Sequence, residues 1–160
     1  PRRSRPEIED VRFEPRSIRS VATMPEDEFI QRLKKLAVAD LAPLGPDLQP
    51  RGRNLVVPEG TGKCSLVIVR KTEALRVHVN AAGRLRLAWE NDIELPITDL
   101  RLFNNDLRTP DTAKARWVQD QLALGAEAFL CFGLGRPFEG FHWLQLNNIH
   151  LSTNPAWQLR

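Results

Sequence analysis

Two short runs in which apolar and polar residues alternate, at 75–80 and 84–89, constrain the fold of this chain most. Their apolar residues are Leu75, Val77 and Val79 in the first run and Leu85, Leu87 and Trp89 in the second. Because strand side chains point alternately to two faces, each run predicts a strand with one face on a core. The segment between them, Ala-Ala-Gly at 81–83, is typical of a hairpin turn. The basic residues expected together on the opposite face are Arg76, His78, Arg84 and Arg86.

The positive charge of the chain is concentrated in the same stretch. The whole chain carries a net charge of +3. Residues 63–89 hold 6 Lys and Arg against 1 Asp or Glu, whereas residues 1–62 hold 11 against 10 and residues 90–160 hold 6 against 9. A local excess of this kind marks a surface for a polyanion, although an ordinary solvated sheet face has the same composition. The predicted hairpin is therefore a candidate binding surface.

The N-terminal third predicts a helix followed by an irregular segment. Thr23 and Glu26 have the spacing of a capping box, which predicts a helix from Thr23 to about Leu41 with an apolar stripe that includes Leu33. Residues 43–62 are rich in Pro, Gly, Asn and Arg and predict an irregular crossing. We therefore expect a division into a segment 1–60, an arm and a helix, and a domain 61–160.

The domain 61–160 is expected to be β-rich with one helix between its strands. Strands are predicted at 63–70, 75–80, 84–89, 93–97, 128–133 and 141–151. The helix is expected from Asp111 or Thr112 to Leu124, and Gly125 supplies its stop. The residues expected in the core of the strands are Leu66, Ile68, Val77, Leu85 and Leu87. Strands, one late helix and strands again predict a small barrel closed by a helix.

The last predicted strand carries two aromatic residues of interest. Phe141 and Trp143 alternate with Leu144 and Leu146, so if the leucines face inward the aromatic rings face outward. Such rings form either a platform on which bases stack or a surface for a protein partner. Phe138 and Trp157 would extend the protein-binding alternative.

The sequence matches none of the catalytic and cofactor-binding motifs that were compared with it. Residues 60–65 (Gly-Thr-Gly-Lys-Cys-Ser) differ from a phosphate loop, which needs glycine at Val57 and Ser or Thr at Cys64. No Ser, Cys or Thr lies in a nucleophile elbow, and no lysine has an acidic residue two positions before it. Cys64 and Cys131 lie in apolar runs and predict buried thiols, not metal ligands. We expect a protein that is not an enzyme, with no catalytic residue, metal or cofactor.

Four segments resemble one protein family. They are Ser65–Val69, the strand Arg84–Trp89, Leu95-Pro96-Ile97-Thr98-Asp99 and Phe132-Gly133-Leu134-Gly135. In these, residues 63 to 151 resemble the second half of the bacterial dual OB-fold-containing domain family, several members of which are linked to nucleic acid or to defence. The resemblance implies an OB barrel at 61–160 and the remainder of a first OB unit within 1–60. The family's final strand carries a Tyr-Lys pair, whereas this chain has His142-Trp143.

These observations predict a β-rich α+β protein, with an OB-like small barrel preceded by a helix-bearing segment. We expect a non-enzymatic nucleic-acid-associated binding module, part of a larger protein or complex, whose partner is single-stranded nucleic acid. The alternative is a protein-interaction or scaffold subunit of a multi-component assembly. The candidate site residues are Arg76, His78, Arg84, Arg86, Phe141 and Trp143. Since the sequence has no apolar run of 18 residues and no signal-peptide core, we expect a cytoplasmic protein without membrane contact.

Overall fold

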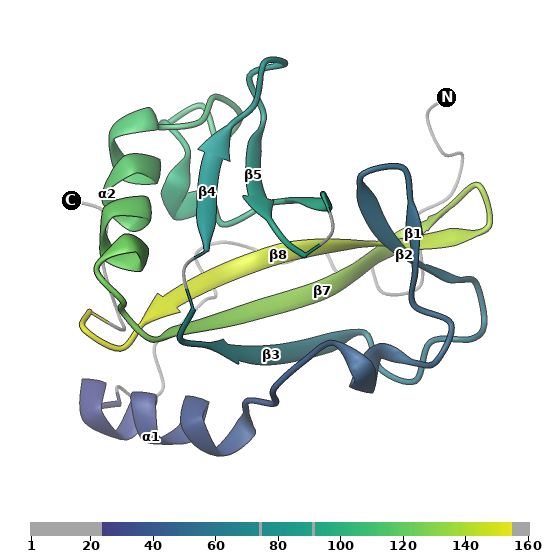
Figure 1. The fold of residues 1–160 in the computed structure, drawn as a ribbon, viewed down its shortest axis with the longest axis horizontal. Coiled ribbons are helices and arrows are strands. Elements are labelled where there is room, and N and C mark those ends of the chain that lie inside the picture. Colours follow the sequence, from purple (N-terminus) through teal and green to yellow (C-terminus); the bar gives the residue numbers. More distant parts are fainter. Residues whose placement is uncertain (1–23, 74, 91, 155–160) are drawn as a thin grey trace, which may run out of the picture.

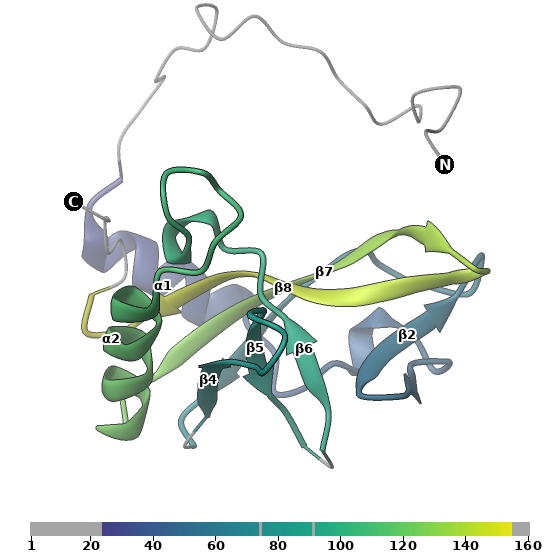
Figure 2. The ribbon, with the colours of Figure 1, turned by 90° about the horizontal axis from the view of Figure 1, so that it is seen from above.

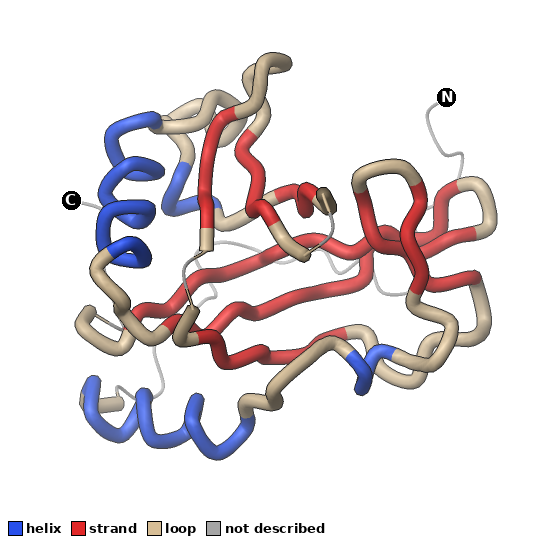
Figure 3. Tube along the Cα trace, viewed as in Figure 1, coloured by secondary structure: helices blue, strands red, loops and turns tan. Residues whose placement is uncertain are grey.

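A computed structural model describes residues 24–73, 75–90 and 92–154. In this part of the chain the fold is β-rich α+β, as predicted, with strands forming two antiparallel sheets (Figures 1 and 3). The helices are α1 (Glu26–Leu36) and α2 (Thr112–Ala123), with short 3-10 helices η2 (Ala42–Leu44) and η3 (Leu100–Leu102). The strands are β1 (Gln49–Arg51), β2 (Asn54–Pro58), β3 (Leu66–Lys71), β4 (Arg76–Val79), β5 (Leu85–Ala88), β6 (Glu94–Pro96), β7 (Ala128–Phe138) and β8 (Phe141–Leu151).

One sheet has five strands in the order β1-β2-β8-β7-β3, and the other has three in the order β4-β5-β6. β7 and β8 form a long hairpin that runs through the whole molecule (Figure 2). The strand predicted at 141–151 is confirmed, and the one predicted at 128–133 continues to Phe138. A register shift between Cys131 and Phe132 changes the alternation of β8, so Leu146 and then Ile149 face the core.

The two sheets meet at the end of β6 without closing into a barrel. Ile97 forms a parallel bridge with Leu146 of β8, and the Thr98 amide donates to the Leu146 carbonyl at 2.8 Å. On the other side, the described part of β4 pairs only with β5 because α2 covers its outer edge. There the Val77 amide donates to the Gln119 side chain at 2.7 Å. The predicted closed barrel is therefore wrong in this respect, since a helix side chain occupies the edge that a neighbouring strand would need.

The main core lies between the two sheets and α2, and a smaller cluster lies under α1. Val77, Leu85 and Leu87 are buried in the main core, as predicted. Leu66 is 69% exposed, contrary to prediction, and Ile68 packs under α1 with Phe129. The run 66–69 is apolar on both faces, so alternation alone could not choose between them.

Both helices lie where the sequence predicts them, with one different boundary. α2 is capped by the Asp111 carboxylate, which accepts from the amides of Ala113 and Lys114, and Gly125 follows with φ of 82°. α1 has Pro25 as its N-cap residue, without a side-chain hydrogen bond, and the predicted cap Thr23 lies outside the described residues. α1 ends at Leu36, five residues before its predicted end.

Within the described residues, neither helix has the length and apolar character that crossing a membrane requires.

The early end of α1 follows from the edge of β3. The Val38 amide donates to the Ile68 carbonyl and the Arg70 amide donates to the Val38 carbonyl, both at 2.9 Å. Val38 thus supplies one strand-like residue to β3, which is incompatible with helical backbone.

Residues 43–62, predicted as irregular, contain the β1–β2 hairpin. The two strands pair through Gln49–Val56 and Arg51–Asn54, and the turn holds Gly52 with φ of 59°. β2 then pairs with the first residues of β8, from Val56–Trp143 to Pro58–Phe141. Residues on both sides of position 60 therefore contribute strands to the same sheet.

Candidate nucleic-acid interface

The four basic residues predicted on one face, here called the basic β-surface, are Arg76, His78, Arg84 and Arg86. His78 and Arg86 lie directly opposite each other in the β4–β5 pair, and Arg76 lies two residues before His78 on the same face. Arg84 precedes β5 by one residue and is two positions from Arg86. Arg76 and Arg84 are exposed, whereas His78 and Arg86 are half-buried. The structure thus brings the four predicted residues together on one side of a hairpin.

The turn of this hairpin fixes the position of Arg84. The Asn80 side-chain oxygen accepts from the amides of Ala82 and Arg84, both at 3.0 Å, and the Asn80 amide donates to the Arg84 carbonyl at 2.9 Å. Gly83 adopts a φ of 70°, which suits glycine. The turn predicted at 81–83 is confirmed, and Asn80 is the residue that orders it.

An acidic residue from β6 lies within the basic β-surface. The Glu94 carboxylate oxygen Oε1 is 3.1 Å from His78 Nε2 and 2.8 Å from a guanidinium nitrogen of Arg53. Glu94 is almost fully buried, and the buried His78 Nδ1 atom has no hydrogen-bond partner within the described part of the chain. Glu94 therefore offsets part of the positive charge at the β6 side of the surface.

The remaining arginines have little compensation. Burial lowers the pKa of the Arg86 guanidinium, and the positive charge of Arg84 lowers it further, while Glu94 acts in the opposite direction. Among the described residues, neither Arg76 nor Arg84 forms an ion pair with a carboxylate. Like charges crowded in this way favour the binding of an anion between them.

The predicted aromatic pair, Phe141 and Trp143, lies at the β2 side of β8. Both rings are half-buried and lie on the face opposite Leu144, as predicted. They are covered by Arg51 of β1, whose guanidinium carbon is 4.4 Å from the Phe141 ring centre and 5.6 Å from that of Trp143. The Arg51 guanidinium is also 2.9 Å from the Glu139 carboxylate in the β7–β8 turn. The rings are therefore stacked under a planar cation and are not an open platform.

The β1–β2 hairpin connects the basic β-surface to this aromatic pair. Arg51 and Arg53 flank Gly52, so one arginine reaches the rings and the other reaches Glu94. The hairpin tip is anchored by the Glu94 amide, which donates to the Arg53 carbonyl at 2.7 Å. Sequence reasoning missed both arginines because it interpreted their segment as irregular. The available signal was the tight Arg-Gly-Arg-Asn turn at 51–54 between two extended segments.

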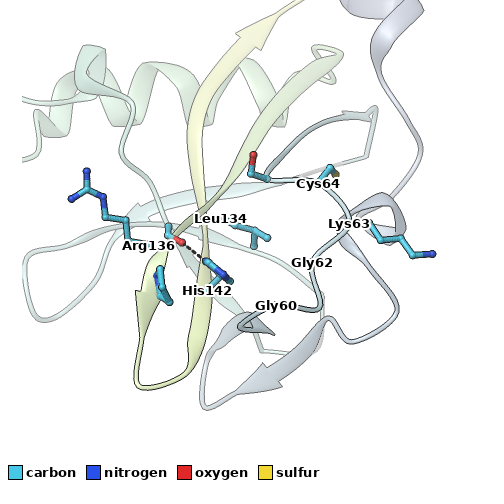
Figure 4. Close-up of a pocket in the computed structure, with 10 residues that line it drawn as sticks. Gly60, Gly62, Lys63, Cys64, Leu134, Arg136 and His142 are labelled. Atoms are coloured by element: carbon cyan, nitrogen blue, oxygen red, sulfur yellow. Dashed lines mark hydrogen bonds between the residues drawn. The ribbon is translucent and has the colours of Figure 1, made fainter. Parts of the chain in front are cut away.

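A pocket of 470 Å³ lies at the end of β7 and is lined in part by the loop that contains Gly60 and Gly62. His142 lies in its wall, with Nδ1 2.9 Å from the Gly135 carbonyl oxygen. Figure 4 shows that Lys63 and Arg136 point away from each other at opposite sides of this pocket. The loop precedes strand β3 and no helix, so it lacks the helix N-terminus that a phosphate loop requires.

Other groups with catalytic potential have structural roles. Burial raises the pKa of the Cys131 thiol to about 11, so the thiol stays protonated near neutral pH. The Asp99 carboxylate is buried, pairs with Arg101 and accepts from the Ile149 amide at 3.1 Å. The same carboxylate caps η3, where it accepts from the Arg101 amide.

The six predicted site residues therefore form two groups, the basic β-surface and the aromatic pair, joined by a hairpin that the sequence did not reveal. Comparisons with protein-family models, with curated proteins and with solved structures gave no match.

Proposed function

We propose that this chain is a non-enzymatic module that binds single-stranded nucleic acid through the basic β-surface and works within a larger cytoplasmic protein or complex. The observation that carries the proposal is the group of three arginines on one sheet face. Arg76 and Arg84 are exposed without a described carboxylate partner, and Arg86 lies beside them with a lowered pKa. A phosphate backbone over this face would relieve the repulsion among the three guanidinium groups.

The aromatic pair supports the choice of a single strand. The side chain of Arg51 is 38% exposed, so the outer face of its guanidinium is open while the inner face stacks on Phe141. An unpaired base would stack on this outer face and extend the series of ring, guanidinium and base. Bases within a duplex are already stacked on their neighbours, so their ring faces are not available to the Arg51 guanidinium.

The order of elements supports a relation to OB folds, which is part of this proposal. β3, β4, β5 and the short strand β6 are followed by α2 and then by β7 and β8, with β3 antiparallel to β7. An OB fold is a partly open barrel that binds oligonucleotides on its second and third strands and on adjacent loops. In this chain those strands correspond to β4 and β5, which carry the basic β-surface.

A protein-interaction or scaffold role is the second candidate. Phe138 is 61% exposed at the β7–β8 turn, where its carbonyl accepts from the Trp143 indole at 3.3 Å. An exposed aromatic side chain beside a half-buried one is typical of the centre of a protein interface. Trp157, which the sequence added to this surface, lies outside the described residues.

Removal of the three arginines tests the first candidate. In the variant Arg76→Ala/Arg84→Ala/Arg86→Ala, we expect the affinity for a single-stranded oligonucleotide to fall at least about tenfold. The slope of log K against log salt should shrink by about two, because each lost phosphate contact removes about 0.7. Fluorescence anisotropy with a labelled 12-nucleotide strand measures both quantities.

A second triple variant provides the matched control. It removes the same charge from the exposed side of α1 through the substitutions Arg32→Ala/Lys34→Ala/Lys35→Ala. α1 packs on the face of the five-stranded sheet that points away from the main core. We expect this variant to keep most of the affinity and both variants to keep the thermal stability. Equal losses in the two variants would mean that binding follows net charge and not the basic β-surface.

A further inference from the structure

A small pocket beside the turn of the β4–β5 hairpin is lined by three arginines. Its volume is 230 Å³, and Arg84, Arg86 and Arg108 line it together with Phe103. The remaining lining residues are Gly83, Leu85, Pro96, Ile97 and Pro110. No carboxylate is among these described lining residues. The pocket, called the arginine pocket below, is therefore strongly positive and has an apolar wall.

The loop between η3 and α2 brings Arg108 to this pocket. The Asp106 carboxylate accepts from the amides of Arg108 and Thr109, both at 2.9 Å, and from the Thr109 hydroxyl at 2.6 Å. Phe103 and Pro110 form a bridge at the base of the loop, which closes it. The backbone that carries Arg108 is thus fixed by its own hydrogen bonds.

The other two arginines that line the pocket come from the β4–β5 hairpin. Asn80 holds the backbone of Arg84 at the hairpin turn, and Arg86 lies within β5. The Asp106 carboxylate accepts from the Thr109 hydroxyl and from the amides of Thr109 and Arg108, and these hydrogen bonds lower its pKa to about 2. It therefore stays ionised near neutral pH and offsets part of the charge of Arg108. The other neighbouring carboxylate, Glu94, is paired with His78 and Arg53.

We propose that the arginine pocket binds a phosphate monoester, namely the terminal phosphate of a single strand whose backbone follows the basic β-surface. This inference rests on the proposed function and adds Arg108 and Phe103 to its site. A terminal phosphate carries a charge of about −1.5 to −2 at pH 7, against −1 for an internal phosphodiester. Three guanidinium groups around one pocket match the larger charge and supply several charge-assisted donors. Phe103 and the two prolines provide an apolar wall for the terminal sugar or base.

The test compares strands that differ only at their ends. The probes are 12-nucleotide strands of one sequence with a 5′-phosphate, a 3′-phosphate or hydroxyl groups at both ends, each labelled at an internal base. With the wild-type chain we expect a terminal phosphate at one end to raise the affinity at least about fivefold. We expect Arg108→Ala to abolish this gain and to keep most of the affinity for the hydroxyl-ended strand.

The matched control is Arg116→Ala, which removes an exposed arginine on α2 outside the arginine pocket. It should keep the gain from the terminal phosphate. The inference is overturned if neither terminal phosphate raises the wild-type affinity, or if the gain persists in Arg108→Ala.

Competition with AMP and with inorganic phosphate separates this inference from the proposed function. If the wild-type chain binds the hydroxyl-ended strand with salt dependence but gains nothing from a terminal phosphate, the proposed function stands and the arginine pocket has no such role. If AMP or phosphate binds in an Arg108-dependent manner and no strand binds, the arginine pocket takes a phosphate monoester but not the end of a strand, and the inference is overturned in that form. The ligand is then a free nucleotide or phosphate, which contradicts the proposed function.

Discussion

Glu94 is the residue that limits the positive charge of the basic β-surface. Its carboxylate contacts the His78 imidazole and the Arg53 guanidinium, and its negative charge lowers the net positive charge that a phosphate would meet on this surface. A glutamine has nearly the same shape and still accepts hydrogen bonds, but it carries no charge. The substitution Glu94→Gln therefore isolates the effect of charge from that of packing.

We expect Glu94→Gln to raise the affinity for a single-stranded oligonucleotide about two- to fivefold, as for one partly screened charge interaction. Anisotropy titration at constant salt measures the change. Glu28→Gln is the matched control, because Glu28 also pairs with an arginine, Arg32, at 2.7 Å but lies on α1. A decrease in affinity, or the same increase in Glu28→Gln, contradicts the role given to Glu94.

Alternation along the strands was sufficient to predict which side chains share a face. It placed His78 with Arg86, and it placed Phe141 with Trp143 away from the leucines. It could not predict the partners of these residues, because Glu94, Arg51 and Arg53 come from other segments of the chain and approach only in the folded chain. Arg108 is the same case, since its loop is ordered by the local bonds of Asp106 but meets the β4–β5 turn only through the fold.

Among the helices and strands, α1 shows most clearly that docking on the sheet depends on a single apolar side. Leu33 is 5% exposed and packs with Ile30 on Phe129 of β7, whereas Leu36 on the same helix is 65% exposed. Removing a buried leucine side chain loses its transfer energy and leaves a cavity, while an exposed one loses neither.

We expect Leu33→Ala to lower the free energy of unfolding by about 2–5 kcal/mol. Leu36→Ala is the control and should change it by less than about 0.5 kcal/mol. Urea denaturation followed by circular dichroism measures both. Equal, small changes in the two variants would show that α1 is not docked on the five-stranded sheet.

The elements with the strongest local signals were predicted best. α2 has a capping aspartate, a buried stripe and a terminal glycine, and β8 has a long alternating pattern. The β1–β2 hairpin was missed because Gln49-Pro50-Arg51 has no alternation and its stability comes from pairing with β8, far away in the sequence. The end of α1 was missed for the same reason, since the pairing of Val38 with β3 is a tertiary contact.

For the whole molecule, the sequence predicted the class and order of elements but not how the sheets meet. The helix α2 was expected to close a barrel, yet it lies along the outer edge of β4, and β4 and β3 belong to different sheets. The decisive contact is one hydrogen bond from Val77 to Gln119, and no local pattern indicates such a pair. The resulting fold leaves the outer face of β4 and β5 available beside the β1–β2 hairpin, where the proposed strand would lie.

The most direct test of the central claim is the affinity of the wild-type chain for a single-stranded oligonucleotide over a series of salt concentrations. We predict binding at micromolar concentration, with log K falling linearly with log salt at a slope of about −2 or steeper. Three phosphate contacts from Arg76, Arg84 and Arg86 account for that slope at about 0.7 each. Absence of salt-sensitive binding to single-stranded DNA and RNA at micromolar concentration would contradict the proposed function and favour the protein-interaction role.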